Sequence, residues 1–252
     1  MKTSILSFLL TSAVCLSAPT AVVVAAPAQE TVVQPVKLTF SPVEITREVR
    51  KANVPASALP LTPQKAMRYL IGADELLTTK PTPNGTILLY SKQGDRENFY
   101  AAFLSKDVLY DLGEIGTRTS LEKTGVAMEK FQQTPLLRIS GIYGANVVET
   151  TYFYLMGTEP RPLLVAEGHL FEQDLDRDGF PEIIASSGTP QITTIYKYKD
   201  GRFQQADLNR QLNAVSVQPH QADHSLFDVY FKGQTNPVTF RYSAGTLQPV
   251  SR

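Results

Sequence analysis

One short segment of this chain carries closely spaced acidic residues that suit a metal ion. It reads Asp-Leu-Asp-Arg-Asp-Gly-Phe-Pro-Glu over residues 174–182, with acids at its first, third, fifth and ninth positions. Ca²⁺ binds oxygen ligands, and alternating carboxylates on a tightly turning loop can converge on one point. Gly179, at the sixth position, supplies a positive-φ turn that a Cβ would oppose. A solvated acidic turn also favours Asp and Gly, but three acids in strict alternation favour a Ca²⁺ site.

The loop departs from an EF-hand, which needs a bidentate Glu at its twelfth position. That position is Ala185 here, and the residues from Ile183 onward predict the start of a buried strand. The expected ligands are four side chains and one backbone carbonyl: the carboxylates of Asp174, Asp176, Asp178 and Glu182, and the carbonyl of Phe180.

A loop with strands on both sides and an acid at the ninth position resembles the calcium loops of FG-GAP (integrin-α-like, VCBS-type) repeats. The matching segment is DLDRDGFPEII, and the resemblance covers residues around 171–185. Such repeats form the blades of β-propellers, with one loop in each blade, whereas this chain has the loop once. The resemblance implies a structural Ca²⁺ ion in an adhesion-type module.

Other chemistry-bearing residues do not form a recognisable catalytic motif. Ser120-x-x-Lys123 and Lys123-Thr-Gly match two elements of penicillin-recognising enzymes, but one lysine cannot fill both roles. His220 and His224 lie four residues apart after a proline, which predicts a polar loop more readily than a zinc site. His169 is expected to be a surface or packed residue. No nucleophile elbow, phosphate-binding loop or dinucleotide fingerprint occurs.

Short apolar segments separated by turn residues follow Asn84-Gly85 and predict a mainly β fold of antiparallel sheets, either propeller-like or a β-sandwich. Lys199-Asp200-Gly201 predicts a tight hairpin turn. The expected strands are residues 86–90, 98–104, 108–112, 136–142, 147–156, 161–167, 182–185, 191–198, 202–206, 214–218, 227–231, 238–242 and 246–248.

One or two short helices are expected before these strands. Ser41-Pro-Val-Glu44 matches a capping box with proline at the first helical position, which predicts a helix to about Ala52. Thr62-Pro63 predicts a second helix with apolar residues at helical spacing as far as Leu77, ending before Pro81. Residues 207–212 predict one further helical turn.

The first 28 residues have the features of a signal peptide. Lys2 precedes a mostly apolar stretch, and Ala26-Pro-Ala28 matches a cleavage site. Cys15 lies in a poor lipobox, so lipid anchoring is not expected. After cleavage the protein would have no stable membrane span. The expected organisation is a signal peptide over 1–28, an extended segment, short helix and linker over 29–61, and a single mainly β domain over 62–252.

The charge composition of the chain limits the classes of partner that the protein is expected to bind. The chain has 24 basic and 24 acidic residues and no basic stripe, which argues against nucleic acid as a partner. The sequence therefore predicts a secreted, non-catalytic, calcium-stabilised β module that binds an extracellular protein or cell-wall glycan, or serves a structural role. The alternative is a secreted hydrolase acting on glycan or peptide, with a site assembled only in three dimensions.

Overall fold

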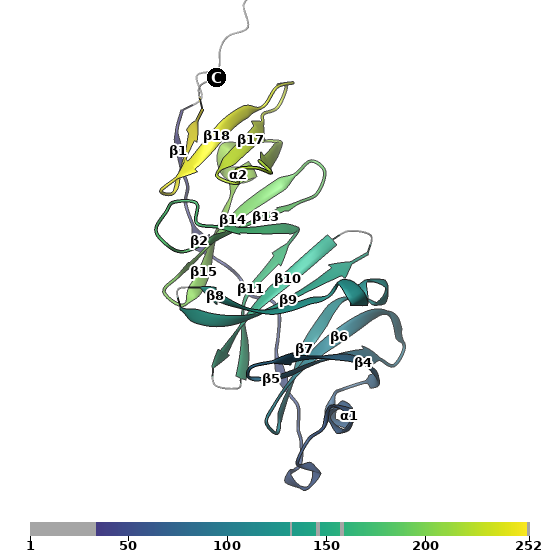
Figure 1. The fold of residues 1–252 in the computed structure, drawn as a ribbon. Coiled ribbons are helices and arrows are strands. Elements are labelled where there is room, and N and C mark those ends of the chain that lie inside the picture. The colour runs from purple at the N-terminus through teal and green to yellow at the C-terminus, as the bar shows by residue number, and fades with distance from the viewer. Residues whose placement is uncertain (1–33, 132, 145–146, 157–158, 251–252) are drawn as a thin grey trace, which may run out of the picture. The chain divides into compact units, whose positions relative to one another are not determined.

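The computed structural model describes residues 34–250, apart from residues 132, 145–146 and 157–158. The predicted signal peptide and Cys15 lie outside the described residues. The described chain is mainly β, which confirms the predicted fold class, and its strands form four antiparallel sheets (Figure 1).

Each sheet is built on four strands that follow one another along the chain. Sheet I contains β4 (Ala73–Thr82), β5 (Gly85–Lys92), β6 (Asp95–Ser105) and β7 (Val108–Thr117). Sheet II contains β8 (Gly125–Phe131), β9 (Thr134–Tyr143), β10 (Val147–Met156) and β11 (Glu159–Glu167). Sheet III contains β12 (His169–Gln173), β13 (Glu182–Ser187), β14 (Ile192–Lys199) and β15 (Arg202–Asp207). Sheet IV contains β16 (Ser216–Pro219), β17 (Leu226–Tyr230), β18 (Val238–Ser243) and β19 (Thr246–Pro249).

The segment before sheet I adds a short edge strand to three of the four sheets, in reverse order. Strand β1 (Val36–Lys37) pairs with β19, β2 (Ser41–Pro42) with β15, and β3 (Arg50–Lys51) with β7. The prediction of a helix from Ser41 to about Ala52 is therefore wrong. Hydrogen bonds to distant strand edges, such as Ala52 N–H to the Leu109 carbonyl at 2.8 Å, replace the helical bonds that a local capping pattern predicted.

Sheet II receives no such strand among the described residues. Its edge strand β11 carries Pro160 and Pro162, which have no N–H to offer a pairing strand. The N-terminal segment instead anchors here through a side chain. Arg47 donates to the carbonyl of Leu112 at 3.2 Å and to that of Glu114, and it forms an ion pair with Glu149. One residue thus ties the segment to both sheet I and sheet II.

Buried apolar side chains join sheet I to sheet II and sheet II to sheet III. The core between sheets I and II includes Phe99, Phe103, Leu137, Ile139 and Phe153. The core between sheets II and III includes Phe131, Tyr152, Leu164, Ile183 and Phe203. At the junction of sheets I and II the backbones nearly touch, since a Cβ on Gly141 would lie 1.9 Å from the Ile115 carbonyl oxygen. Only glycine fits at that point.

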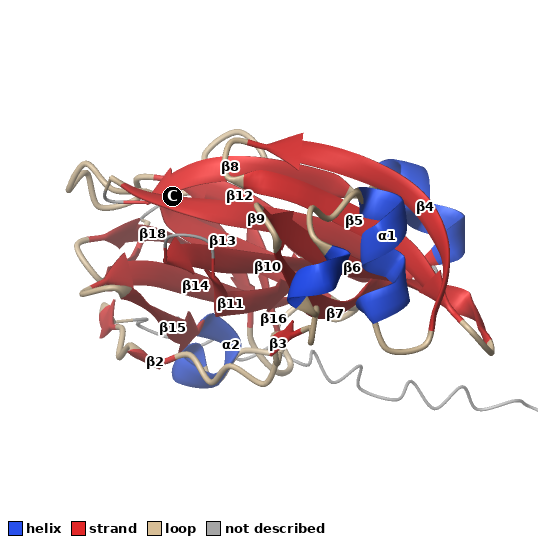
Figure 2. Ribbon diagram, turned by 90° about the horizontal axis from the view of Figure 1, so that it is seen from below, coloured by secondary structure: helices blue, strands red, loops and turns tan. Residues whose placement is uncertain are grey.

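The helices are short and lie beside sheet I and between sheets III and IV (Figures 1 and 2). Helix α1 (Pro63–Ala66) begins at the predicted Thr62-Pro63, and the Thr62 hydroxyl accepts from the Lys65 N–H. The helix was predicted to continue as far as Leu77 and to end before Pro81, and this is wrong: a 3₁₀ turn ends at Tyr69 and strand β4 begins at Ala73. Helix α2 (Leu208–Leu212) confirms the predicted helical turn and is capped by Asp207.

Candidate metal centre

The acidic loop connects β12 to β13, and the pairing of these strands brings its two ends together. Gln173 pairs with Glu182, so Asp174 at the start of the loop and Glu182 at its end become neighbours. Gly179 has a φ of +88°, and a Cβ there would contact nothing within 4 Å. The glycine is therefore needed for its backbone conformation and not for space.

Three of the predicted ligands converge. Carboxylate oxygens of Asp174, Asp176 and Glu182 all lie within 4.8 Å of one another. A Ca²⁺ ion binds oxygen at roughly 2.3–2.6 Å, so two ligands on opposite sides of one ion lie about 5 Å apart. The spacing fits a single hard cation, and this acidic trio could hold a metal ion.

The carboxylates also organise the loop backbone. Asp174 accepts from the N–H groups of Asp178 at 3.1 Å and Gly179 at 3.0 Å. Glu182 is only 3% exposed, and its carboxylate accepts from the Leu175 N–H at 2.7 Å. These bonds fix the orientation of the acids before any ligand binds.

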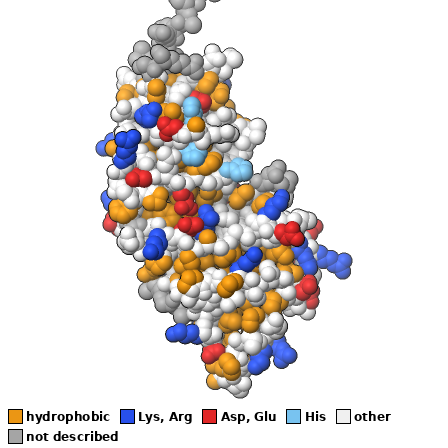
Figure 3. Space-filling model, viewed as in Figure 1, with side chains coloured by type: hydrophobic (Ala, Val, Ile, Leu, Met, Phe, Trp, Pro, Cys, Tyr) orange, Lys and Arg blue, Asp and Glu red, His pale blue; other side chains and the backbone are white. Residues whose placement is uncertain are grey.

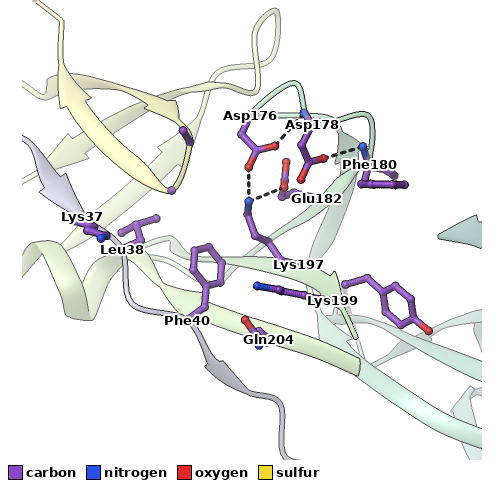
Figure 4. A pocket seen from close by; sticks show the side chains of 14 residues that line it. Lys37, Leu38, Phe40, Asp176, Asp178, Phe180, Glu182, Lys197, Lys199 and Gln204 are labelled. Carbon is purple, nitrogen blue, oxygen red and sulfur yellow. Dashed lines mark hydrogen bonds and ion pairs between the residues drawn. The ribbon is translucent and has the colours of Figure 1, made fainter. Parts of the chain in front are cut away.

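The two remaining predicted ligands lie beside the trio. The Asp178 carboxylate accepts from the Phe180 N–H at 2.8 Å, and Phe180 as a residue is 40% exposed. Both side chains line the pocket drawn in Figure 4. The ligand roles of Asp178 and of the Phe180 carbonyl stay predictions.

Lys197 is the functional residue that sequence reasoning missed. Its ammonium lies between two members of the trio, in an ion pair with Asp176 and 3.1 Å from Glu182 Oε1 (Figure 4). Strand register explains the contact, because Ile183 on β13 pairs with Tyr196 on the antiparallel strand β14. The residue before Ile183, Glu182, therefore lies beside the residue after Tyr196, which is Lys197. The signal that could have found it is the short hairpin between these two strands.

Burial and neighbouring charges have opposite effects on the pKa values of Glu182 and Lys197. Burial raises the pKa of Glu182, while the Leu175 N–H and Lys197 act to lower it. Burial alone would lower the pKa of Lys197, but the carboxylates of Asp176 and Glu182 outweigh burial, so the pKa is raised. Lys197 therefore stays protonated at neutral pH. One ammonium facing three acids leaves an excess of negative charge that a divalent cation could balance.

Two aromatic rings from other parts of the chain flank the ammonium. The Lys197 Nζ lies 5.7 Å from the centre of the Phe40 ring and 5.7 Å from that of Tyr242. Phe40 belongs to the N-terminal segment and Tyr242 to β18, so the cluster lies where this segment and sheets III and IV meet. A pocket of about 490 Å³, lined by Phe40, Asp176, Glu182 and Lys197 among others, opens beside it.

The serine motif has a structural explanation. The Ser120 hydroxyl is buried and donates to the carbonyls of Thr117 at 2.7 Å and Ile142 at 2.9 Å. These bonds hold the 3₁₀ turn Arg118–Lys123 against β9. The motif is therefore accounted for by packing.

The histidines lie near one another on one face of the molecule (Figure 3). Their side chains do not have the spacing of a metal site. His169 and His220 line one pocket of about 520 Å³, and His224 stacks on Phe171 with ring centres 4.1 Å apart. Within the described ranges, the acidic trio alone has metal-ligand spacing. His220 Nε2 lies 3.0 Å from Asp228 Oδ2, so this pocket contains a histidine–carboxylate pair.

Comparison of the chain with known protein families, with curated proteins and with solved structures finds no match. The helices among the described residues are far shorter than the roughly 20 apolar residues that a membrane-spanning helix needs.

Proposed function

We propose that this protein is a secreted, non-catalytic β module of the cell envelope or extracellular space, with a binding or structural role and a fold stabilised by Ca²⁺. The observation that carries the proposal is the convergence of Asp174, Asp176 and Glu182 within 4.8 Å. Hard carboxylate oxygens without any sulfur or imidazole suit Ca²⁺ better than a transition metal. Waters and loop carbonyls would supply the remaining ligands.

A Ca²⁺ ion in this loop would act on the fold through sheets III and IV. It would neutralise the acids, fix the turn between β12 and β13, and leave Lys197 to move into the adjoining pocket. Extracellular Ca²⁺ is often millimolar, so even a weak site would be filled and would stabilise the folded state by mass action. The balanced net charge supports protein or glycan partners over nucleic acid.

Thermal unfolding tests the calcium claim. Ca²⁺ should raise the melting temperature of the chelator-treated protein, and Asp176→Asn should abolish the rise. Asp74→Asn is the matched control, because Asp74 is exposed on the edge strand β4. Equal melting with Ca²⁺ and with chelator in the wild-type protein would remove the proposal.

The second candidate is a hydrolase, and one specific observation favours it. The pocket of His169 and His220 also contains Asp228, whose other carboxylate oxygen accepts from Thr239 Oγ1 at 2.8 Å. A histidine held by an oriented carboxylate can act as a general base toward water. Mass spectrometry of oligosaccharides and peptides incubated with wild-type protein and with His220→Gln decides between the two. Products formed by the wild-type protein alone would favour the hydrolase.

A further inference from the structure

We propose that the histidine pocket, bounded by β12, β16 and β17, binds a neutral oligosaccharide. The inference rests on the proposed role as a binding module, but it does not need the calcium ion. The pocket of about 520 Å³ lies within the size range of small-ligand sites. It is separate from the acidic trio, since the two share no lining residue.

The polar groups of the pocket are of the kind that recognises sugar hydroxyls. Gln191, Gln218 and Gln221 line it, and each amide can donate and accept at the same time. A sugar hydroxyl also donates and accepts, so amide and hydroxyl pairs satisfy each other in both directions. Gln218 and Gln221 are exposed, which leaves their amides accessible to a ligand.

The charge of the pocket favours a neutral ligand. No lysine or arginine lines it, so nothing there would attract a phosphate, a nucleotide or an acidic peptide. Its one carboxylate, Asp228, faces His220 at 3.0 Å and accepts from Thr239, so it is already engaged. A cationic ligand would have to compete with these contacts.

An aromatic ring completes the site. Phe171 lines the pocket and is half-buried, and its stacking on His224 at 4.1 Å holds the ring in place. Ring faces pack against the apolar C–H surface of sugars, while the polar edge of the sugar bonds to amides and imidazoles. The Nε2 of His224, which stacks on this ring, is buried and makes no hydrogen bond within the described residues.

The chain offers a direct probe of this pocket. It contains three histidines, of which two line the pocket and the third stacks on its aromatic ring. The imidazole signals of tag-free, ¹⁵N-histidine-labelled protein therefore report on this region. We would record them during titration with chitotetraose, cellotetraose and maltotetraose, once with Ca²⁺ and once with chelator.

At least one of the three sugars should produce saturable shifts in the histidine signals. The double variant Gln218→Ala/Gln221→Ala should bind that sugar about tenfold or more weakly, because two hydrogen-bonding side chains are lost. Gln248→Ala, which changes an exposed glutamine elsewhere in sheet IV, should bind like the wild type. Unchanged melting temperatures would show that both variants fold.

The absence of shifts with all three sugars would overturn the inference, as would equal binding by the double variant. Shifts that occur equally with chelator would support the sugar site even if the calcium proposal failed. Conversely, a calcium effect on melting without any sugar binding would leave the proposed function standing and remove this inference.

Discussion

At the residue scale, Lys197 and a divalent cation would compete for the same carboxylates. The ammonium contacts Asp176 and Glu182, which are two of the three acids that would bind Ca²⁺. Any ion must therefore displace an existing buried ion pair, and the affinity of the loop is set by this exchange as well as by its acids.

Lys197→Met should raise the Ca²⁺ affinity by about tenfold, because the ion no longer has to displace an ammonium. Lys199→Met is the matched control: Lys199 lines the same pocket on the same strand, but it is exposed. Fluorescence titration against a calcium indicator would measure both. Equal or weaker binding by Lys197→Met would show that the lysine does not compete.

Asp95, the first residue of β6, gives a second prediction at the residue scale. The Tyr100 hydroxyl and the Asn98 N–H donate to its carboxylate and lower its pKa to about 2. A lowered pKa in the folded state contributes stability above the unfolded value of 3.8, and this stability is lost as the pH falls toward 2. Asp95→Asn should therefore destabilise the protein at neutral pH, and its difference from the wild type should shrink below pH 3.8.

Urea unfolding at a series of pH values would measure this effect. Asp74→Asn, which removes an exposed carboxylate, should show no such trend. A constant difference between Asp95→Asn and the wild type across the acid range would contradict the assignment.

At the scale of the strands, the close approach of β7 and β9 makes glycine indispensable at one position. Gly141→Ala would place its Cβ 1.9 Å from the Ile115 carbonyl oxygen, so one of the two sheets must move. We expect a loss of about 1–3 kcal/mol in the free energy of unfolding. Gly125→Ala on β8 is the matched control, since its nearest neighbour would be the Ser140 Cβ at 3.7 Å. Similar losses in the free energy of unfolding of the two variants would contradict the close approach of Gly141 to Ile115.

Local sequence predicted the strands well where turn residues separate them. Asp200 and Gly201 both have positive φ, 52° and 78°, as the predicted hairpin turn requires. Strand β8 was missed because Ala127, Met128 and Glu129 favour helix when taken alone. Strand β12 was missed because Gly168 alone separates it from β11.

The acidic residues of the candidate site could be predicted from the sequence, but the lysine that contacts them was missed. The spacing of Asp174, Asp176 and Glu182 is local information, and the structure brings these three together. The position of Lys197 depends on strand register, and those of Phe40 and Tyr242 depend on how distant segments pack. The short β13–β14 hairpin gives a local indication of the Lys197 contact, but no local pattern encodes the contacts of Phe40 and Tyr242.

At the scale of the whole described chain, the N-terminal segment connects the sheets. It adds strands to sheets IV, III and I, and Arg47 anchors it where sheets I and II meet. The Arg47 and Glu149 side chains are only 12% and 19% exposed, so breaking their ion pair leaves a partly buried charge without its partner.

Arg47→Met should lower the free energy of unfolding by about 2 kcal/mol, between the cost of losing an exposed ion pair and that of breaking a fully buried one. Arg50→Met is the matched control, because the Arg50 and Glu48 side chains are 70% and 72% exposed. Chemical denaturation would measure both variants. An unchanged free energy of unfolding in Arg47→Met would mean that this residue does not anchor the N-terminal segment.

Calorimetric titration of Ca²⁺ into the chelator-treated protein tests the central claim most directly. We predict saturable binding of one ion, retained in Glu122→Gln, where the residue is exposed, and lost in Glu182→Gln. The absence of binding heat in the wild-type protein, together with an unchanged melting temperature, would contradict the account and reduce the loop to an acidic turn paired with Lys197.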